Sequence, residues 1–163
     1  VYRLTVTTAD VPQFHFPLRV KPDGLKDVTD ARATLTAPVA LNGRIEKPGT
    51  ANEWKLDLKK GGRYALDLIA RRAESPLCGV VTITDATGKE VAKAEATETN
   101  DPAPLAFSPS VDGTFTVRVS EKYRGRGGPN FAYRLAVTDA AAPAGESGFR
   151  LALATDALTL PRR

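Results

Sequence analysis

The strongest pattern in this chain is an alternation with a period of two over residues 52–70, in which large apolar side chains occupy every second position of each half. Alternation with a period of two places one set of side chains on the buried face of a β-strand and the other set in water. Gly61 and Gly62 interrupt the alternation, and glycine readily adopts the backbone conformations that a turn between strands requires. The stretch therefore predicts two strands joined at the glycines, in a sheet with one buried face. Trp54 and Tyr64 are in phase with the apolar positions, which predicts that both rings lie in the core.

Further short runs of apolar and β-branched residues follow at close intervals, separated by glycine, proline and aspartate turn signals. No segment shows the 3.6-residue period of an amphipathic helix over three turns. This pattern predicts an all-β protein, an antiparallel jelly-roll or Greek-key β-sandwich of about eight strands, with flanking strands from linker segments. The short, unequal strands favour a sandwich over a closed barrel. Besides the opening stretch, strands are predicted within residues 39–45, 77–84, 89–97, 105–107, 114–120 and 131–138.

A short repeat indicates how the chain is organised. Val1–Thr7 (VYRLTVT) recurs as Ala132–Thr138 (AYRLAVT), and a proline-containing linker follows each copy. Beyond these linkers, Phe14–Leu18 aligns with Phe149–Leu153. We therefore interpret the chain as part of a longer, processed protein that carries such modules in tandem.

The repeat divides the chain into four parts. Residues 1–20 are predicted to hold the end strand of a preceding module and a linker strand. Residues 21–37 are a connecting segment, predicted to be mostly loop because they have no sustained apolar period. Residues 38–138 form one complete sandwich. Residues 139–163 form a linker and a strand that leads to the next module.

Composition narrows the possible functions. Apolar residues make up 42% of the chain and charged residues 26%, as in ordinary soluble globular proteins. The net charge of +4 comes from Lys and Arg spread among nearly as many acids, so we expect no nucleic-acid partner. No apolar run approaches the roughly 18 residues of a membrane span, so we expect no membrane insertion.

The chain has one cysteine, Cys78, and one histidine, His15. A lone cysteine forms no disulfide within the chain, and Cys78 begins an apolar strand, so we predict a buried structural role for it. A Cys–His or Ser–His catalytic pair would have to use His15. We therefore expect that the protein is not an enzyme. The alternative is a fragment of a secreted peptidase or other hydrolase that uses His15 or Ser75.

Several short motifs carry a family resemblance because they occur in a fixed order. They include Leu41–Ile45 (LNGRI), Lys60–Tyr64 (KGGRY), Ala70–Leu77 (ARRAESPL), Ile83–Glu90 (ITDATGKE), Asp112–Val119 (DGTFTVRV) and Phe131–Leu135 (FAYRL). Together they resemble the bacterial pre-peptidase C-terminal domain over residues 38–138. The resemblance implies a jelly-roll-like sandwich in secreted bacterial proteins, beside peptidases or in large modular surface proteins, and not itself catalytic. Related domains are similar to carbohydrate- and collagen-binding modules, some of which use calcium.

The glycine-rich stretch 121–130 contains the best candidate binding residues, which are Tyr123, Arg124 and Arg126. An aromatic ring can stack on a ligand, and guanidinium groups can bind anions. The alternative is a loop with solvated charges.

A second loop contains candidate calcium ligands. Glu98, Asn100 and Asp101 could supply three oxygens to a calcium ion, which takes about six to eight. The alternative is a solvated polar loop in which Asp101 starts a turn before Pro102. The chain also departs from the family pattern at Pro48–Trp54 (PGTANEW), where the acids that family members often carry are mostly missing. No other cofactor is expected.

These features together predict a non-catalytic extracellular module that acts as a spacer or as a weak binding or stabilising unit. Its parent would be a large secreted, cell-envelope or periplasmic bacterial protein, and its partners the neighbouring domains of that protein. The alternative is a module that binds a polysaccharide or an extracellular matrix protein, assisted by calcium.

Overall fold

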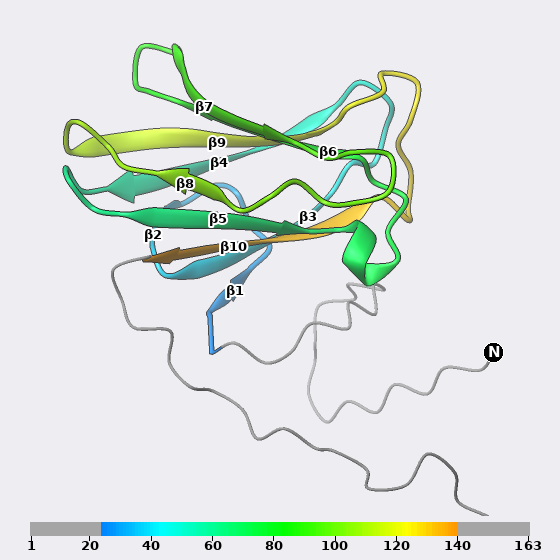
Figure 1. Ribbon diagram of the computed structural model, residues 1–163, viewed down its shortest axis with the longest axis horizontal. Coiled ribbons are helices and arrows are strands. Elements are labelled where there is room, and N and C mark those ends of the chain that lie inside the picture. The colour runs from blue at the N-terminus through cyan, green and yellow to red at the C-terminus, as the bar shows by residue number, and fades with distance from the viewer. Residues whose placement is uncertain (1–23, 140–163) are drawn as a thin grey trace, which may run out of the picture.

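In the computed structural model, which describes residues 24–139, two five-stranded β-sheets pack face to face (Figure 1). Sheet A has the strand order β1-β3-β10-β5-β8, and sheet B has the order β2-β4-β9-β6-β7. The predicted all-β sandwich is therefore confirmed. Sheet A consists of β1 (Asp27–Val28), β3 (Val39–Arg44), β10 (Ala132–Asp139), β5 (Tyr64–Ile69) and β8 (Leu105–Phe107). Sheet B consists of β2 (Thr34–Thr36), β4 (Ala51–Leu58), β9 (Gly113–Glu121), β6 (Gly79–Thr84) and β7 (Glu90–Glu95).

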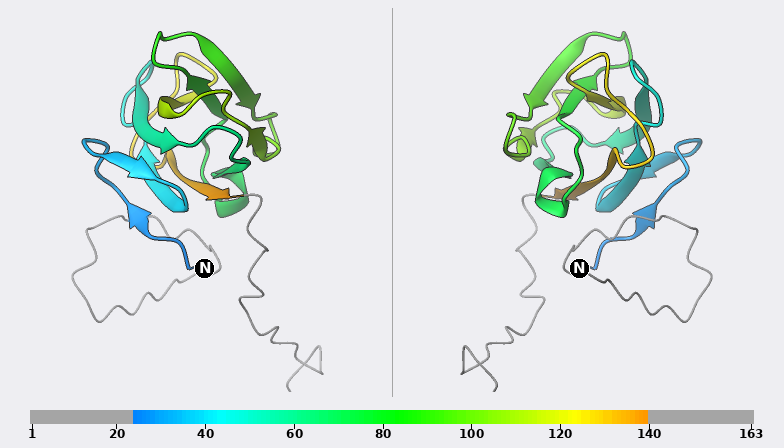
Figure 2. Two further views of the ribbon diagram at one scale, coloured as in Figure 1. Left: turned by 90° about the vertical axis from the view of Figure 1, so that its left-hand side faces the viewer. Right: turned by 90° about the vertical axis from the view of Figure 1, so that its right-hand side faces the viewer.

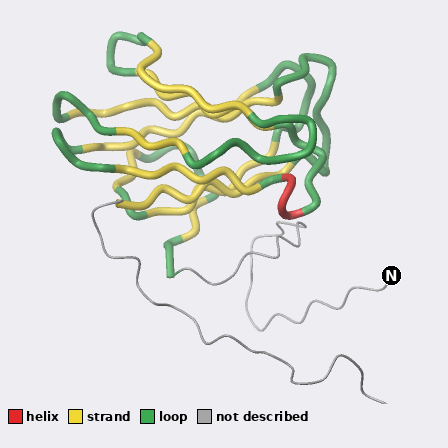
Figure 3. The backbone as a smooth tube through the Cα atoms, in the orientation of Figure 1, coloured by secondary structure: helices red, strands yellow, loops and turns green. Residues whose placement is uncertain are grey.

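The one helical element among residues 24–139 is η1 (Arg71–Ala73), a single 3-10 turn at one corner of the sandwich, coloured red in Figure 3. It ends at Glu74, which adopts a left-handed conformation with φ of 67°. No helix in the described part of the chain is long and apolar enough to span a membrane.

The strands β1 and β2 differ from the others because they pair in parallel. β1 pairs with β3 and β2 pairs with β4, whereas the remaining pairs are antiparallel. Both lie in the segment 21–37, which the sequence predicts to be mostly loop, and Figure 2 shows them along one side of the sandwich. The edges of β3 and β4 offer backbone groups that even a very short strand can pair with. The sheets are therefore mixed at this edge. The predicted segment 1–20 lies outside the described residues, as does the predicted segment 139–163 apart from Asp139, which ends β10.

The two strands of the alternating stretch 52–70 do not form a hairpin, which corrects the expectation of a neighbouring pair. β4 lies in sheet B beside β9, and β5 lies in sheet A beside β10. Both strands point their apolar side chains into the same core, which is possible when the chain crosses from one sheet to the other. Gly61 allows this crossing with φ of 75°, and Gly62 leaves room for the ring of Tyr64.

The core lies between the sheets and contains the side chains of the predicted apolar phase. Trp54 is 2% exposed and Tyr64 is 8% exposed, which confirms the predicted position of both rings. Each large apolar side chain that is buried in this way stabilises the fold by roughly 1.5–3 kcal/mol. The inward-facing residues of β4, β5 and β9 alternate with more exposed ones, whereas β3 and β10 are buried over most of their length.

A hydrogen-bonded chain of side chains crosses the core near Tyr133. Trp54 Nε1 donates to the Tyr133 hydroxyl at 2.9 Å, and this hydroxyl donates to Asn52 Oδ1 at 3.0 Å. Burial raises the pKa of Tyr133, an effect that outweighs the lowering by the hydrogen bond from Trp54. Gly43 lies opposite Tyr133 in the β3–β10 ladder, and a Cβ atom at Gly43 would come within 2.3 Å of the hydroxyl. The ring of Tyr133 therefore needs a glycine in β3.

Candidate functional site

Arg126, one of the predicted binding residues, holds the loop between β9 and β10 in place. Its Cζ lies 5.5 Å from the ring centroid of Tyr123 and 5.4 Å from that of Phe131. Its Nη2 donates to the backbone carbonyl of Pro76, and its Nη1 lies 3.9 Å from Glu121 Oε1. Both faces of chemistry that Arg126 could offer a ligand, its planar guanidinium for stacking and its N–H groups for hydrogen bonds, are therefore engaged in contacts within the protein.

Glu121 is the buried acid that faces Arg126. Its Oε2 accepts the backbone N–H of Cys78 at 2.9 Å, and its Oε1 accepts that of Tyr123 at 3.1 Å. Cys78 is buried, as predicted, and its thiol donates to the Thr97 carbonyl at 3.2 Å. Glu121 is not among the predicted site residues, although it has the same inward parity in β9 as Val119. That parity was the signal that could have found it.

The glycines of this loop allow it to pack tightly against the turn that follows β3. A Cβ atom at Gly127 would come within 2.6 Å of the Lys47 carbonyl carbon. Gly128 donates its N–H to the Ile45 carbonyl at 2.9 Å. These glycines therefore serve close backbone packing.

The remaining two predicted binding residues of the loop point to solvent. Tyr123 is 38% exposed, and Arg124 is exposed with no recorded partner within residues 24–139. The Tyr123 hydroxyl lies 3.5 Å from Glu98 Oε1, so the structure brings the two predicted sites to the same end of the molecule. The predicted group of three is thus divided: Tyr123 and Arg124 are exposed, whereas Arg126 is used for contacts within the protein.

Asp101, one of the predicted calcium ligands, caps the turn η1. Its side chain is 3% exposed and accepts the backbone N–H groups of Ala70 at 3.1 Å, Arg71 at 2.7 Å and Arg72 at 3.1 Å. Arg72 Nε also donates to it at 3.1 Å, and Arg72 Nη2 donates to Asp67 at 2.6 Å. Burial lowers the pKa of Arg72, but the hydrogen bonds to Asp67 and Asp101 outweigh it, so the net shift is upward.

The two other predicted calcium ligands make local contacts. Asn100 Nδ2 donates to the Thr99 hydroxyl at 3.0 Å, and Glu98 accepts from Tyr123. No group of three or more His, Cys, Asp or Glu side chains positioned for a metal occurs among the described residues. Asp101 directs its carboxylate at N–H donors, so it acts as a cap in this structure.

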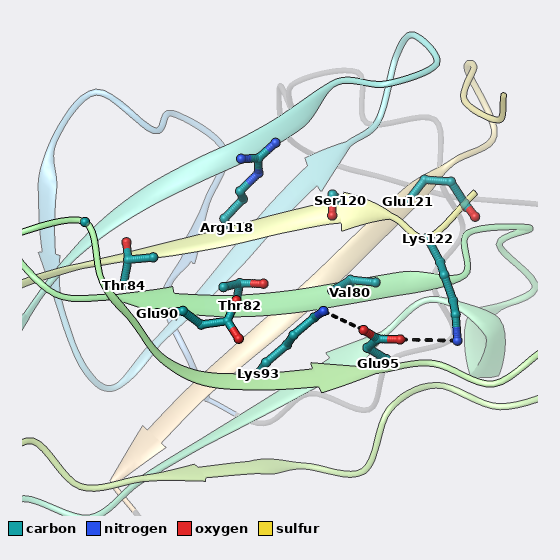
Figure 4. A pocket seen from close by; sticks show the side chains of 11 residues that line it. Val80, Thr82, Thr84, Glu90, Lys93, Glu95, Arg118, Ser120, Glu121 and Lys122 are labelled. Atoms are coloured by element: carbon teal, nitrogen blue, oxygen red, sulfur yellow. Dashed lines mark ion pairs between the residues drawn. The ribbon is translucent and has the colours of Figure 1, made fainter. Parts of the chain in front are cut away.

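The outer face of sheet B carries an open hollow of about 450 Å³ over β6, β7 and β9 (Figure 4). Arg118, Thr82 and Lys93 are neighbours across these three strands. Arg118 is exposed and has no recorded partner in the described part of the chain (Figure 4). Hydroxyl groups and charged groups thus line this surface, and none of its lining residues is aromatic. We call it the sheet B groove.

A row of ion pairs borders the sheet B groove. Glu95 lies 2.6 Å from Lys93 Nζ and 3.3 Å from Lys122 Nζ. The hydrogen bond from Lys93, with that from Lys122, lowers the pKa of Glu95, and the hydrogen bond to Glu95 raises the pKa of Lys93. These groups are exposed to solvent, so they set the charge of the rim and add little to stability.

A second hollow, of about 710 Å³, opens on the side of the sandwich between β3 and β4. Its wall includes Thr29 and Ala31, from the segment that joins β1 to β2, and the strand residues Asn42 and Asn52. This hollow arises where the short strands β1 and β2 stop pairing with β3 and β4, and no pattern in the sequence predicts it. We call it the edge slot.

The serine considered for hydrolysis has a structural role. Ser75 is 3% exposed, its hydroxyl donates to the Asn130 carbonyl at 3.2 Å, and its oxygen accepts the Leu77 N–H at 3.3 Å. His15 lies outside the described residues. Ser75 therefore joins the same set of loops as Glu121 and Arg126.

No family model and no curated protein matches the chain. Among solved structures, the chain is similar to the pre-peptidase C-terminal domain of collagenase from Bacillus anthracis, with a TM-score of 0.47 and 11% sequence identity. The match covers 73% of this chain and 99% of that chain.

Proposed function

We propose that this chain is a non-catalytic accessory module, a spacer or stabilising unit, of a secreted or cell-envelope bacterial protein with several domains. The observation that carries the proposal is the use of the charged loop residues inside the protein. Asp101, Glu121 and Arg126 each bind backbone groups of neighbouring loops. Such internal ties stabilise the connections between strands, which suits a unit that has to stay folded in a long chain.

The short repeat supports a parent protein with modules in tandem. Tyr133, Leu135 and Val137 of the second copy are core residues of β10. Tyr2, Leu4 and Val6 occupy the matching positions of the first copy. The residues that the two copies of the repeat share at these positions are thus the residues that are buried in the core of this module. This agreement favours a preceding module of the same type.

The experiment that tests this proposal is a hydrolase assay on the full 163-residue chain with casein and p-nitrophenyl acetate as substrates. We expect no turnover above that of a heat-denatured sample. Turnover that is lost in Ser75→Ala or in His15→Ala, with the fold retained by circular dichroism, would contradict the proposal.

A second candidate function, the binding of a polysaccharide or matrix protein, is favoured by the sheet B groove. Arg118 has no partner within residues 24–139, and the hydroxyl groups of Thr82 and Ser120 line the same surface. A glycan array and a collagen pull-down with the full chain test this function. Retention that is lost in Arg118→Ala but kept in Lys55→Ala would support it, and no retention would count against it.

A further inference from the structure

The chain enters and leaves the described sandwich at the same end of sheet A. β1 runs parallel to β3, and β3 runs antiparallel to β10, so the start of β1 and the end of β10 lie on either side of the start of β3 (Figure 1). Asp27, Ala40 and Ala136 are register partners in one row across these three strands. Two spacings between neighbouring strands place the chain entry and the chain exit roughly 10 Å apart. Tension between the two flanking parts of the chain therefore acts across the strands and not along them.

The direction of this tension decides which strand separates first. Hydrogen bonds between strands lie approximately across the strands, so tension in that direction breaks the pairs one after another rather than all together. β1 lies at the edge of sheet A and pairs over two residues, Asp27 and Val28. β10 lies inside the sheet and pairs over six residues with β3 and over six with β5. β1 should therefore separate before β10.

Residues 24–38, which we call the entry segment, can separate without opening the core. None of them is buried, whereas the buried residues begin at Val39. Val28, Leu35 and Ala37 are only partly buried against the core. β2 pairs with β4 over three residues, while β9 pairs with β4 along its whole length. Loss of the entry segment would therefore leave two packed sheets with the buried core between them.

One side chain fastens the entry segment to the strand by which the chain leaves. Asp27 Oδ1 accepts Asn42 Nδ2 at 2.8 Å and Arg134 Nε at 3.1 Å. The Asp27 side chain is 61% exposed and the Arg134 side chain is 6% exposed, so the bond joins a surface acid of β1 to a buried arginine of β10. Hydrogen bonds between charged groups are about twice as strong as neutral ones. Asp27 therefore adds a direct bond between chain entry and chain exit to the short backbone pairing of β1.

We infer that the entry segment is a mechanical release: under tension it separates from the sandwich before the core unfolds, and the bonds of Asp27 to Asn42 and Arg134 set the force at which it does so. Its release lengthens the chain by up to about 50 Å, because an extended chain spans about 3.4 Å per residue. Unfolding of residues 39–139 would add several times as much, roughly 340 Å. The inference rests on the proposed function, because tension reaches the module only within a longer parent chain.

Optical tweezers test the release on the full 163-residue chain, held by handles at its two ends. We expect an early transition that adds about 50 Å and a later one that adds roughly 340 Å. A disulfide can lock the entry segment in a Cys78→Ala background that carries Asp27→Cys and Ala40→Cys, because these two positions are partners in neighbouring strands. The early transition should be absent from the oxidised protein and should return with reductant.

Two single substitutions measure the fastening. Asp27→Ala removes the acceptor of Asn42 and Arg134, so the early transition should occur about tenfold faster at a fixed force. The later transition should not change, because it starts after this bond has already broken. Asp30→Ala is the matched control and should change neither transition, since Asp30 is an exposed acid of the same segment that contacts Arg32 within that segment.

Three results would overturn the inference. They are a single transition that includes the core, an early transition that persists in the oxidised protein, and equal effects of Asp27→Ala and Asp30→Ala. The hydrolase assay tests the non-catalytic function separately, so either idea can fail without the other.

Discussion

The loops at one end of the sandwich and the sheet B groove both contain many charged residues, but they use them in opposite ways. In the loops, which we call the tied loops (residues 70–78, 96–101 and 121–131), Asp101, Glu121 and Arg126 bind backbone groups of one another's segments. In the groove, Arg118 is exposed with no recorded partner in the described part of the chain, and Lys93 forms an ion pair with Glu95 at the surface. Charge in a loop therefore does not by itself mark a binding site, since a buried carboxylate surrounded by N–H groups stabilises the fold.

This difference has an energetic basis. A carboxylate that is removed from water needs several donors to replace its hydration, and Asp101 has three backbone N–H groups and one guanidinium. Exposed pairs such as Lys93 with Glu95 keep most of their hydration and gain little. The tied loops should therefore respond strongly to mutation, and the groove should respond weakly.

The largest effect is expected for Asp101→Ala. The substitution leaves the N–H groups of Ala70, Arg71 and Arg72 without their acceptor and should destabilise the full chain by about 3 kcal/mol. Urea denaturation followed by fluorescence of Trp54 measures it. Asp57→Ala is the matched control on an outer strand face and should change stability by less than about 0.5 kcal/mol. Equal losses in both variants would remove the distinction between the tied loops and the strand faces.

The next effect compares two arginines of the same loop. Arg126→Ala removes the donor to Pro76 and the stacking on Tyr123 and Phe131, which should cost about 2 kcal/mol. Arg124→Ala should cost less than about 0.5 kcal/mol because Arg124 is exposed without a recorded partner in the described chain. The same denaturation experiment serves both variants. A loss in Arg124→Ala as large as that in Arg126→Ala would show that the loop is held in another way.

A smaller effect is expected where the core meets the edge slot. Tyr133→Phe keeps the ring over Gly43 but leaves Trp54 Nε1 without an acceptor, which should cost about 1–2 kcal/mol. Tyr123→Phe, at the surface of the tied loops, is the control and should be nearly neutral. Thermal unfolding measures both. A neutral Tyr133→Phe would mean that the buried hydroxyl contributes nothing to the core.

The smallest effect belongs to the rim of the sheet B groove. The folded-state pKa of Glu95 is lowered from 4.5 by Lys93 and Lys122, so its contribution is present at neutral pH and is lost as pH falls through the acidic range below about 4.5. Glu95→Gln should therefore slightly reduce the dependence of the melting temperature on pH in that range, and 1 M salt should abolish the difference. A large loss of stability in Glu95→Gln at neutral pH would show that this rim contributes to the fold as the tied loops do.

The sequence predicts the core of this protein well because burial in a sandwich follows parity. Trp54, Tyr64 and Tyr133 are all buried, as the alternation predicts. The predicted turn residues lie between the strands. What the alternation does not contain is which strands become neighbours. Inward and outward positions alternate in the same way whether β4 and β5 lie in one sheet or in two. The prediction that both strands belong to one sheet is therefore wrong, although the predicted burial is correct.

The candidate sites were harder to predict, for a physical reason. Residue type gives the chemistry of Asp101 and Arg126 but not the direction in which the side chain points, and that direction depends on loops far apart in the sequence. Asp101 meets residues 70–72, and Arg126 meets Pro76. Glu121 was predictable in part. It lies at an inward-facing position of β9, where a buried carboxylate requires hydrogen-bond donors or an opposite charge.

The most direct test of the central claim is a calcium titration of the full chain, monitored by its melting temperature, with and without a chelator. If Asp101 is a cap for residues 70–72, calcium and chelator leave the melting temperature unchanged, whereas Asp101→Asn lowers it in both conditions. Glu98→Gln, at the neighbouring exposed acid, should change nothing in either condition. A melting temperature that rises with calcium in the wild type, and no longer rises in Asp101→Asn, would contradict the claim and assign this loop to a ligand.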